Sequence, residues 1–290
     1  MRRRAFFGSL GALAFSAAAA IGLSRMARKP PPKPQGPARL VSLSPALTET
    51  VLALGGASLL VGVSDFCELP STTRLPRVGS SLTPNYEAIA GLRPTLILSD
   101  GSVASKGRAL AELAPCETLP WLTLSEVVAS TRRLGALLNQ PAAGNALAAQ
   151  LEARLSRQPP ANAPRVLLLL SYDATRPAEL WFIKRNSLHG AALSAAGARN
   201  AVDRDVSGLP KLGLEELVAL DPDMVFILPP PGSSAEQQRE LVRAFGAQVP
   251  LRAVEQGRVT TVRGTQSVGP SILELVEALS QALASGGRRE

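Results

Sequence analysis

Two stretches of the chain, YEAIAGLRPTLILSD at residues 86–100 and LEELVALDPDMVFIL at residues 214–228, share one pattern. Each has a Glu in second place, then a Leu-x-Pro triplet, then a short apolar run, and equivalent residues lie 128 positions apart. The pattern predicts a helix that ends before Pro and leads into a strand. Its repetition indicates two similar α/β lobes. The helix dipole favours a first-turn acid only mildly, so the shared Glu87 and Glu215 are candidate functional residues, although stabilisation of their own helices remains an alternative.

The rest of the chain alternates between strand-like and helix-like patterns. Short apolar runs predict strands at residues 39–43, 60–63, 96–99, 119–122, 165–170, 180–183, 224–228 and 259–262. Apolar residues at helical spacing predict helices at residues 48–54, 86–92, 105–113, 187–196, 214–220, 234–245 and 271–284. Strands that alternate with helices imply parallel sheets covered on both faces. The sequence therefore predicts an α/β fold.

The segment between the two series has the pattern of one long helix. Residues 125–157 carry apolar residues at helical spacing and a single internal proline, Pro141, where a kink is an option. PPANAP at residues 159–164 ends the helix. We therefore expect an N-terminal lobe at residues 39–123, an interdomain helix at residues 124–158 and a C-terminal lobe at residues 164–288.

The formal net charge of +8 arises at the N-terminus. Residues 1–38 contain seven of the 31 Lys and Arg residues and no acid, so 24 remain against all 23 Asp and Glu. Arginines before an uncharged run at residues 5–23 are typical of an export signal, and Arg3-Arg4 resembles the twin-arginine type. Residues 1–24 are thus an export signal or an uncleaved membrane anchor, and residues 25–38 a proline-rich spacer. The near-neutral remainder argues against a nucleic-acid partner.

The motifs of common enzyme classes are missing from the sequence. His189 is the single histidine, which excludes a two-histidine zinc motif. The chain also lacks a G-x-S-x-G nucleophile motif, a phosphate-binding G-x-x-x-x-G-K-[ST] loop and a G-x-G-x-x-G dinucleotide motif. We therefore predict a protein that is not an enzyme, with no catalytic residue, no metal site and no cofactor.

Several stretches resemble, in the same order, the substrate-binding proteins of ABC importers for cobalamin and iron chelates. They are residues 39–98, SLHGAALSAAGARNAV at residues 187–202, LPKLGLEELVALDPDMVFIL at residues 209–228 and VEQGRVTTVRG at residues 254–264. The resemblance covers almost everything after the spacer and is closest to the cobalamin binders. It implies the class III periplasmic-binding fold, in which two Rossmann-like lobes with parallel sheets are joined by one long α-helix and hold the ligand between them.

The resemblance also implies a function and partners. We expect an exported, periplasmic monomer that captures a corrinoid or a ferric chelate and delivers it to the ABC permease subunits in the membrane. In this family one exposed acid on each lobe docks onto permease arginines, and the matching positions are Glu87 and Glu215, with Glu216 as the alternative. Haem or another metal chelate is the alternative ligand, and a membrane-tethered sensor or scaffold is the alternative role.

Six residues are candidates for ligand contacts: Phe66, Ser81, Asp100, Tyr172, Trp181 and Arg263. Phe66 stands where cobalamin binders carry an aromatic residue, whereas Ser81 and Asp100 stand where they often have Trp. Aromatic walls with a few polar groups suit a flat macrocycle.

The C-terminal candidates rest on their positions along predicted strands. Tyr172 follows the first strand of the second lobe, and Trp181 and Phe182 are neighbours that face opposite sides of a strand, so at most one of the two lines the site. Arg263 can meet an anionic group of the ligand. His189, at the start of an apolar helix, is expected to be a capping or surface residue rather than an axial metal ligand.

The two cysteines, Cys67 and Cys116, both fall in the predicted N-terminal lobe. An exported protein meets an oxidising compartment, so a disulfide and a pair of free thiols both remain open.

Overall fold

The computed structural model describes residues 38–70, 72–102, 104–264 and 268–287. The predicted signal or anchor at residues 1–24 and residues 25–37 of the predicted spacer lie outside the described residues. The described residues belong to one compact unit. Within that part of the chain, none of the helices has the length and apolar character needed to traverse a lipid bilayer.

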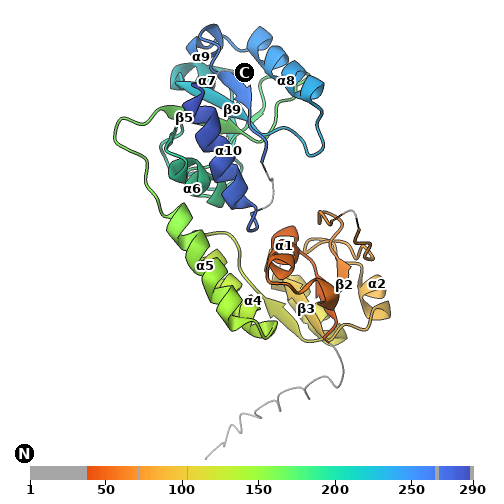
Figure 1. Cartoon of the computed structure of the whole chain (residues 1–290). Coiled ribbons are helices and arrows are strands. Elements are labelled where there is room, and N and C mark those ends of the chain that lie inside the picture. Colours follow the sequence, from red (N-terminus) through yellow and green to blue (C-terminus); the bar gives the residue numbers. More distant parts are fainter. Residues whose placement is uncertain (1–37, 71, 103, 265–267, 288–290) are drawn as a thin grey trace, which may run out of the picture. The chain divides into compact units, whose positions relative to one another are not determined.

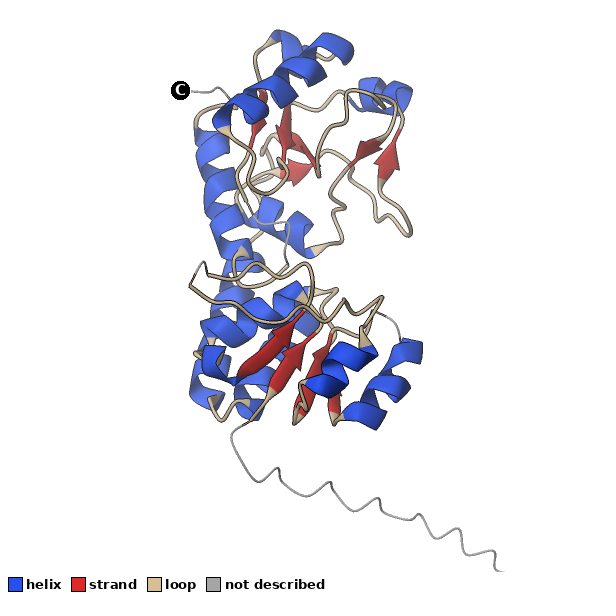
Figure 2. Ribbon diagram, turned by 90° about the vertical axis from the view of Figure 1, so that its right-hand side faces the viewer, coloured by secondary structure: helices blue, strands red, loops and turns tan. Residues whose placement is uncertain are grey.

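The N-terminal sheet consists of four parallel strands in the order β2-β1-β3-β4 (Figures 1 and 2). The strands are β1 (Leu40–Ser42), β2 (Leu60–Val63), β3 (Leu96–Ser99) and β4 (Cys116–Thr118). Its helices are α1 (Pro45–Ala53), the 3₁₀ turn η1 (Ala57–Leu59), α2 (Tyr86–Gly91) and α3 (Ala104–Leu113). The strand predicted at residues 119–122 was wrong, because β4 begins three residues earlier and ends at Thr118. Leu119 and Trp121 belong to the loop after β4, and their side chains are buried.

The C-terminal sheet also has four parallel strands, in the order β10-β9-β5-β7. The strands are β5 (Arg165–Leu169), β7 (Arg199–Asn200), β9 (Met224–Ile227) and β10 (Val259–Thr261). Its helices are α6 (Leu188–Ala195), α7 (Leu214–Leu220), α8 (Ala235–Gln248), α9 (Arg252–Glu255) and α10 (Ile272–Ala284). Counted along the chain, both four-stranded sheets have their strands in the order second, first, third, fourth, so the two lobes share one topology.

A two-stranded antiparallel ribbon accompanies the C-terminal sheet. It pairs β6 (Leu180–Trp181) with β8 (Lys211–Leu212). The strand predicted at residues 180–183 is therefore shorter than expected and does not join the parallel sheet as a full strand, although Phe182 forms an isolated bridge to Leu169.

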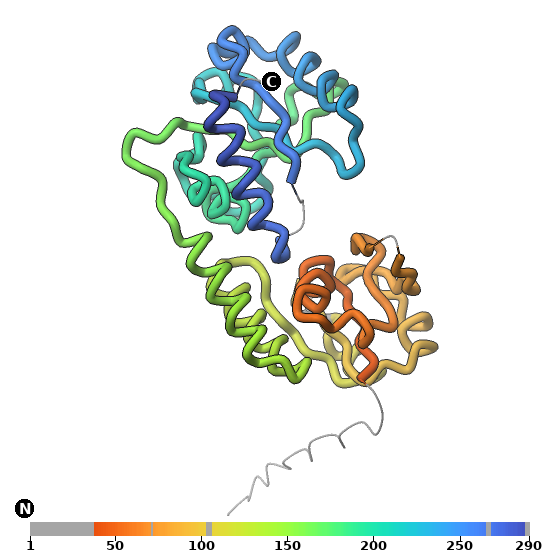
Figure 3. Tube along the Cα trace, viewed as in Figure 1, coloured from red at the N-terminus to blue at the C-terminus, as the bar shows by residue number. Residues whose placement is uncertain are grey.

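The connection between the lobes differs from the prediction of one long helix at residues 124–158. It consists of two helices, α4 (Leu124–Leu137) and α5 (Pro141–Leu155), that lie side by side (Figures 1 and 3). Asn139 has a φ of 57° and Pro141 opens α5, so the segment turns where the sequence suggested a kink. Gly135 and Gly144 bring the two backbones together: a Cβ on Gly135 would lie 2.6 Å from the Cα of Gly144.

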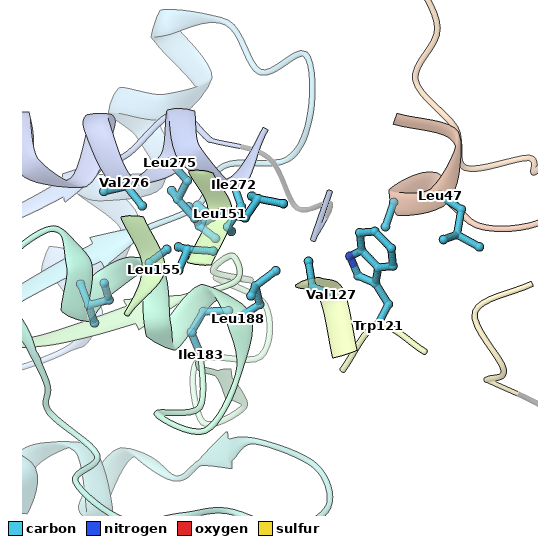
Figure 4. Close-up of a cluster of buried hydrophobic side chains, with 14 of the residues drawn as sticks. Leu47, Trp121, Val127, Leu151, Leu155, Ile183, Leu188, Ile272, Leu275 and Val276 are labelled. Atoms are coloured by element: carbon cyan, nitrogen blue, oxygen red, sulfur yellow. The ribbon is translucent and has the colours of Figure 1, made fainter. Parts of the chain in front are cut away.

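One hydrophobic cluster includes residues from both lobes and from the connecting helices (Figure 4). The N-terminal lobe contributes Leu47 and Trp121, the connecting helix α5 contributes Leu151, and the C-terminal lobe contributes Leu188 and Ile272. Each lobe has a further cluster of its own, around Ile89 and around Phe245. Burial of a shared apolar surface ties the lobes to α5 in addition to the covalent connection.

The cysteines are free thiols in the structure. Cys67 belongs to the shared cluster, where its Sγ lies 3.1 Å from the Thr48 hydroxyl, whereas Cys116 packs against the N-terminal lobe's own cluster. Of the two options that the sequence left open, the structure shows the unpaired state. Burial raises the pKa of the Cys67 thiol, which keeps it protonated and unreactive.

Candidate ligand and docking sites

The carboxyl-terminal edge of the N-terminal sheet presents three exposed apolar side chains. Phe66 follows β2, Leu122 follows β4, and Leu82 lies in the loop between β2 and α2; their exposed fractions are 71%, 81% and 61%. β2 and β4 are the outer strands of the sheet, so Phe66 and Leu122 stand towards opposite ends of this edge. Ligands of open parallel sheets bind beyond the carboxyl ends of the strands, so this edge is a candidate ligand surface.

The two polar candidates of this lobe have local structural roles. Ser81 is buried, and both its amide and its hydroxyl donate to the Leu43 carbonyl, at 3.1 and 3.0 Å. This anchors the loop at the end of β1 and leaves the neighbouring Leu82 outward. A carboxylate oxygen of Asp100 accepts hydrogen bonds from the amide of Ser102, at 3.0 Å, and from its hydroxyl. The residue that Ser81 positions, Leu82, was not among the sequence candidates.

The C-terminal lobe has a polar cavity beside Trp181. The cavity, of about 200 Å³, is lined by Leu170, Ser171, Asp173, Arg176, Glu179 and Trp181. The Lys211 ammonium lies 4.6 Å from the centre of the Trp181 ring and 3.1 Å from a Glu179 carboxylate oxygen. Arg176 pairs with Asp173 at 3.1 Å. The lining therefore combines an aromatic ring with the Arg176–Asp173 ion pair and with Glu179, whose partner Lys211 lies next to the lining residues.

Two other candidates of this lobe are buried. Tyr172 is 7% exposed, its hydroxyl donates to Gln248 Oε1 at 2.7 Å, and its ring meets Phe245 edge-on at 5.1 Å. Burial raises the pKa of the Tyr172 phenol, and the nearby Asp173 carboxylate raises it further. His189 is 6% exposed on α6, so the expectation of a surface residue was wrong. Phe182 is buried beside the half-buried Trp181, as the opposite-face argument predicts.

Leu209 and Arg263 lie at further loops of the C-terminal lobe. Leu209, 73% exposed, precedes β8, and Arg263 is exposed after β10. Leu209 was missed as a candidate, like Leu82 and Leu122. The signal was available, because each is a lone leucine in a loop that also holds Pro, Gly, Ser or Thr: SLTP, PWLT and GLPK.

The loops that follow equivalent strands of the two sheets contact each other. Trp121, after β4, donates from its indole nitrogen to the Val268 carbonyl, after β10, at 2.7 Å. Glu49 of α1 accepts a hydrogen bond from the amide of Ser271, which caps α10. A carboxylate at this position complements the positive end of the α10 dipole.

The two repeated glutamates occupy equivalent helix positions. Glu87 is the second residue of α2, whose cap Asn85 accepts from the Ala88 amide at 3.0 Å, and Glu215 is the second residue of α7. Both side chains are exposed, and among the described residues neither has an ion-pair partner.

The alternative residue, Glu216, is engaged within the lobe. Its carboxylate pairs with the Arg204 guanidinium at 2.6 Å. Because Glu215 is not held in this way, the geometry favours Glu215 over Glu216 as the acid that is available to a partner.

Comparison with known proteins gives a consistent result. The sequence matches the periplasmic binding protein family over residues 40–264. A cobalamin-binding protein of Halobacterium salinarum is 30% identical over 203 residues, which cover 65% of this chain and 53% of the relative. The chain thus spans about half the length of that relative.

Solved structures share the fold. A periplasmic heme binding protein from Pseudomonas aeruginosa aligns with a TM-score of 0.69 and 29% identity, over 85% of this chain and 92% of the other. The vitamin B12 binding protein BtuF of Vibrio cholerae aligns with a TM-score of 0.67 and 24% identity, over 87% and 99%. The predicted class III α/β fold with parallel sheets is confirmed, apart from the single connecting helix. The chain belongs to the periplasmic binding protein family.

Proposed function

We propose that the protein is the substrate-binding component of an ABC importer and that it captures a corrinoid or a related metal chelate. The observation that carries this proposal is the set of exposed apolar side chains, Phe66, Leu82 and Leu122, at the carboxyl edge of a parallel sheet. Such a surface fits the flat apolar face of a macrocycle. The family is one of binding proteins, and curated relatives carry the names cobalamin-binding and vitamin B12-binding protein.

The second half of the ligand site is the cavity beside Trp181. The indole ring offers an aromatic face, while Lys211 and Arg176 can turn from Glu179 and Asp173 towards amide, carboxylate or phosphate groups at the rim of the ligand. Arg263 and Leu209, exposed on other loops of this lobe, are further candidates for ligand contact. On the opposite lobe, the Ser81-anchored loop presents Leu82, and Asp100 is the polar group that follows β3.

The ligand that fits best is one whose metal needs no further ligand from the protein. Tyr172 and His189, two side chains of the kind that bind haem iron axially, are both buried, and the Tyr172 hydroxyl is committed to Gln248. A corrinoid or a ferric siderophore needs no axial ligand from the protein, whereas haem does. Haem remains the second candidate, because the Pseudomonas aeruginosa heme binding protein is 29% identical.

The partner in this proposal is the ABC permease in the membrane. Glu87 and Glu215, exposed at equivalent helix positions of two lobes with one topology, suit two equivalent basic sites on a pair of permease subunits. The protein acts as an exported monomer in the periplasm, released from its signal or held at the membrane by residues 1–24, and has no nucleic-acid partner.

Titration with three ligands tests the proposal. The purified protein is incubated with cyanocobalamin, haemin and a ferric hydroxamate siderophore, and binding is followed by visible absorbance and calorimetry. We expect saturable binding of cyanocobalamin with one ligand per chain. Tight binding of haemin alone would replace the corrinoid with the second candidate, and no binding of any of the three would overturn the proposal.

A further inference from the structure

The repeat extends to the hydrogen bonds that hold each repeated helix. Arg39, just before β1, donates from Nη2 and Nε to the Leu92 carbonyl, at 2.8 and 3.2 Å, and from Nε to the Arg93 carbonyl at 3.3 Å. These two carbonyls follow the last turn of α2.

The C-terminal lobe makes the same arrangement with Arg165, the first residue of β5. Its guanidinium donates to the Leu220 carbonyl at 2.9 Å and to the Asp221 carbonyl at 3.4 Å, at the end of α7. Leu220 and Asp221 are the residues that the 128-position repeat aligns with Leu92 and Arg93.

The backbone of each arginine adds two equivalent hydrogen bonds. The Arg39 amide donates to Thr95 Oγ1 at 2.8 Å, and the Arg165 amide donates to Asp223 Oδ2 at 2.8 Å. In return the Arg39 and Arg165 carbonyls accept from the amides of Thr95 and Asp223, at 2.8 and 2.9 Å. The 128-position repeat aligns Thr95 with Asp223, but Arg39 and Arg165 are 126 positions apart, so the repeat alone does not pair the two arginines.

These bonds act where the helices are weakest. After α2 and α7 the chain passes through Arg93 and Asp221, with φ of 46° and 38°, a left-handed conformation that strains a non-glycine residue. Helices of six and seven residues are not stable alone. A guanidinium across the terminal carbonyls offsets both costs and complements the helix dipole.

We propose that Arg39 and Arg165 are a matched pair of positioning residues that fix the direction in which Glu87 and Glu215 meet the permease. The inference rests on the proposed docking role. Charge at an interface mainly sets the association rate, whereas a well-fitted geometry sets the dissociation rate. The glutamates therefore control encounter, and the arginines control how long the complex lasts.

The test uses Arg39→Lys and Arg165→Lys in the full mature chain, with Arg108→Lys, an exposed arginine of α3, as the matched control. Lysine keeps the charge but cannot span two carbonyls as the guanidinium fork does. Cyanocobalamin-loaded protein is added to right-side-out membrane vesicles of the source organism, and association and dissociation are followed by fluorescence. Hydrogen exchange of α2 and α7 is measured on the same samples.

We expect each Lys variant to dissociate about tenfold faster, equivalent to about 1.4 kcal/mol, with an association rate and a cyanocobalamin affinity like those of the Arg108→Lys control. Amide exchange should accelerate in α2 for Arg39→Lys and in α7 for Arg165→Lys, each without the other. Arg39→Gln, which offers one neutral amide nitrogen in place of the charged fork, should behave as Arg39→Lys does.

The variant Glu87→Gln distinguishes the docking role of the glutamates from the positioning role of the arginines. If this variant associates more slowly while the arginine variants dissociate at the control rate, the positioning role is overturned and the docking role stands. If Glu87→Gln and Glu215→Gln both bind like the unaltered protein, the docking role fails, and the positioning role with it. Loss of cyanocobalamin affinity in the Lys variants would also overturn the positioning role, since it would indicate general damage to the lobe.

Discussion

Trp121 and Val268 are 147 residues apart in the sequence and are joined by a hydrogen bond of 2.7 Å from the indole nitrogen to the carbonyl. Glu49 and Ser271 form a second link between the same parts of the chain. Arg154 of α5 also pairs with Glu277 of α10, at 3.3 Å. With the shared hydrophobic cluster, these contacts brace the C-terminal lobe against the N-terminal lobe and α5.

The first prediction concerns motion. Because the two lobes share contacts and a core, ligand binding should change the radius of gyration only slightly, whereas wide closure needs a free hinge. Small-angle scattering with and without cyanocobalamin measures this. A large contraction would show that the contacts between the lobes yield on binding.

The variant Trp121→Phe tests the hydrogen bond between Trp121 and Val268 directly. It keeps an aromatic ring but removes the donor, so the Val268 carbonyl loses its partner and stability should fall by about 1–3 kcal/mol. Urea unfolding gives the loss. Trp181→Phe, at the half-buried tryptophan outside this contact, is the control and should unfold like the unaltered protein. Equal stability of the two variants would show that the hydrogen bond between Trp121 and Val268 does not stabilise the protein.

The second prediction separates ligand contact from core packing among the aromatic residues. Phe66→Ala should weaken cyanocobalamin binding about tenfold or more without lowering the melting temperature, because the Phe66 side chain is 71% exposed. Tyr172→Phe should do the reverse, because the Tyr172 hydroxyl is bonded to Gln248 inside the lobe. Calorimetric titration and thermal unfolding report the two effects, and a Tyr172→Phe variant with impaired binding would return Tyr172 to the ligand site.

Tyr172 also gives a pH dependence. Burial raises the pKa of this phenol above that of the unfolded chain. A group of this kind contributes stability that is complete below the unfolded pKa, near 10, and is lost as the pH rises towards the folded pKa. Unfolding free energies should therefore decline less steeply above pH 10 in Tyr172→Phe than in the unaltered protein. Parallel declines would mean that Tyr172 does not ionise differently on unfolding.

The third prediction concerns docking. In the double variant Glu87→Ala with Glu215→Ala, cyanocobalamin uptake by cells should fall sharply while ligand affinity and melting temperature stay nearly unchanged. The matched control is Glu216→Ala, which removes an acid that already pairs with Arg204. Such an exposed pair contributes at most about 1 kcal/mol. Equal uptake by the double variant and the control would remove the docking role.

The fourth prediction concerns export. Replacing Arg3 and Arg4 with Lys keeps the charge of the leader but alters the pair that twin-arginine recognition requires. Precursor should accumulate in the cytoplasm, as measured by fractionation and immunoblotting. Unchanged periplasmic levels would assign the leader to the general secretory route.

Much of the fold was predictable because its strands are short apolar runs bounded by Pro, Gly or polar residues. β2 and β3 have the predicted limits, and α7 coincides with the predicted helix. The two-residue strands β7 and β8 were not predicted, since a run of two residues carries no period. The turn at Asn139 was missed because apolar spacing continues on both sides of it, and only the left-handed φ and the close approach of Gly135 to Gly144 reverse the chain.

The sequence predicted which loops hold the candidate residues, but it did not predict which way their side chains point. Phe66 and Trp181 have the partial or high exposure that a ligand contact needs. Ser81 and Tyr172 lie in the expected loops, yet their polar atoms are bonded inside the lobes. Whether the polar atom of a loop residue is bonded inside the lobe depends on the carbonyl or amide that lies beneath it, and no local pattern in a single sequence gives that.

The link from Glu49 to Ser271 bears on the order of folding. Its two residues are separated by 222 positions, so among the described residues the last helix, α10, receives its N-terminal carboxylate from the first, α1. Contacts of such high sequence separation form late, because the entropy of closing the loop must be offset before they contribute. A ribosome must release the chain as far as Ala284 before α10 can be completed. Until then the nascent N-terminal lobe leaves part of the shared apolar cluster uncovered, which makes newly made protein more vulnerable to aggregation and proteases than the finished molecule.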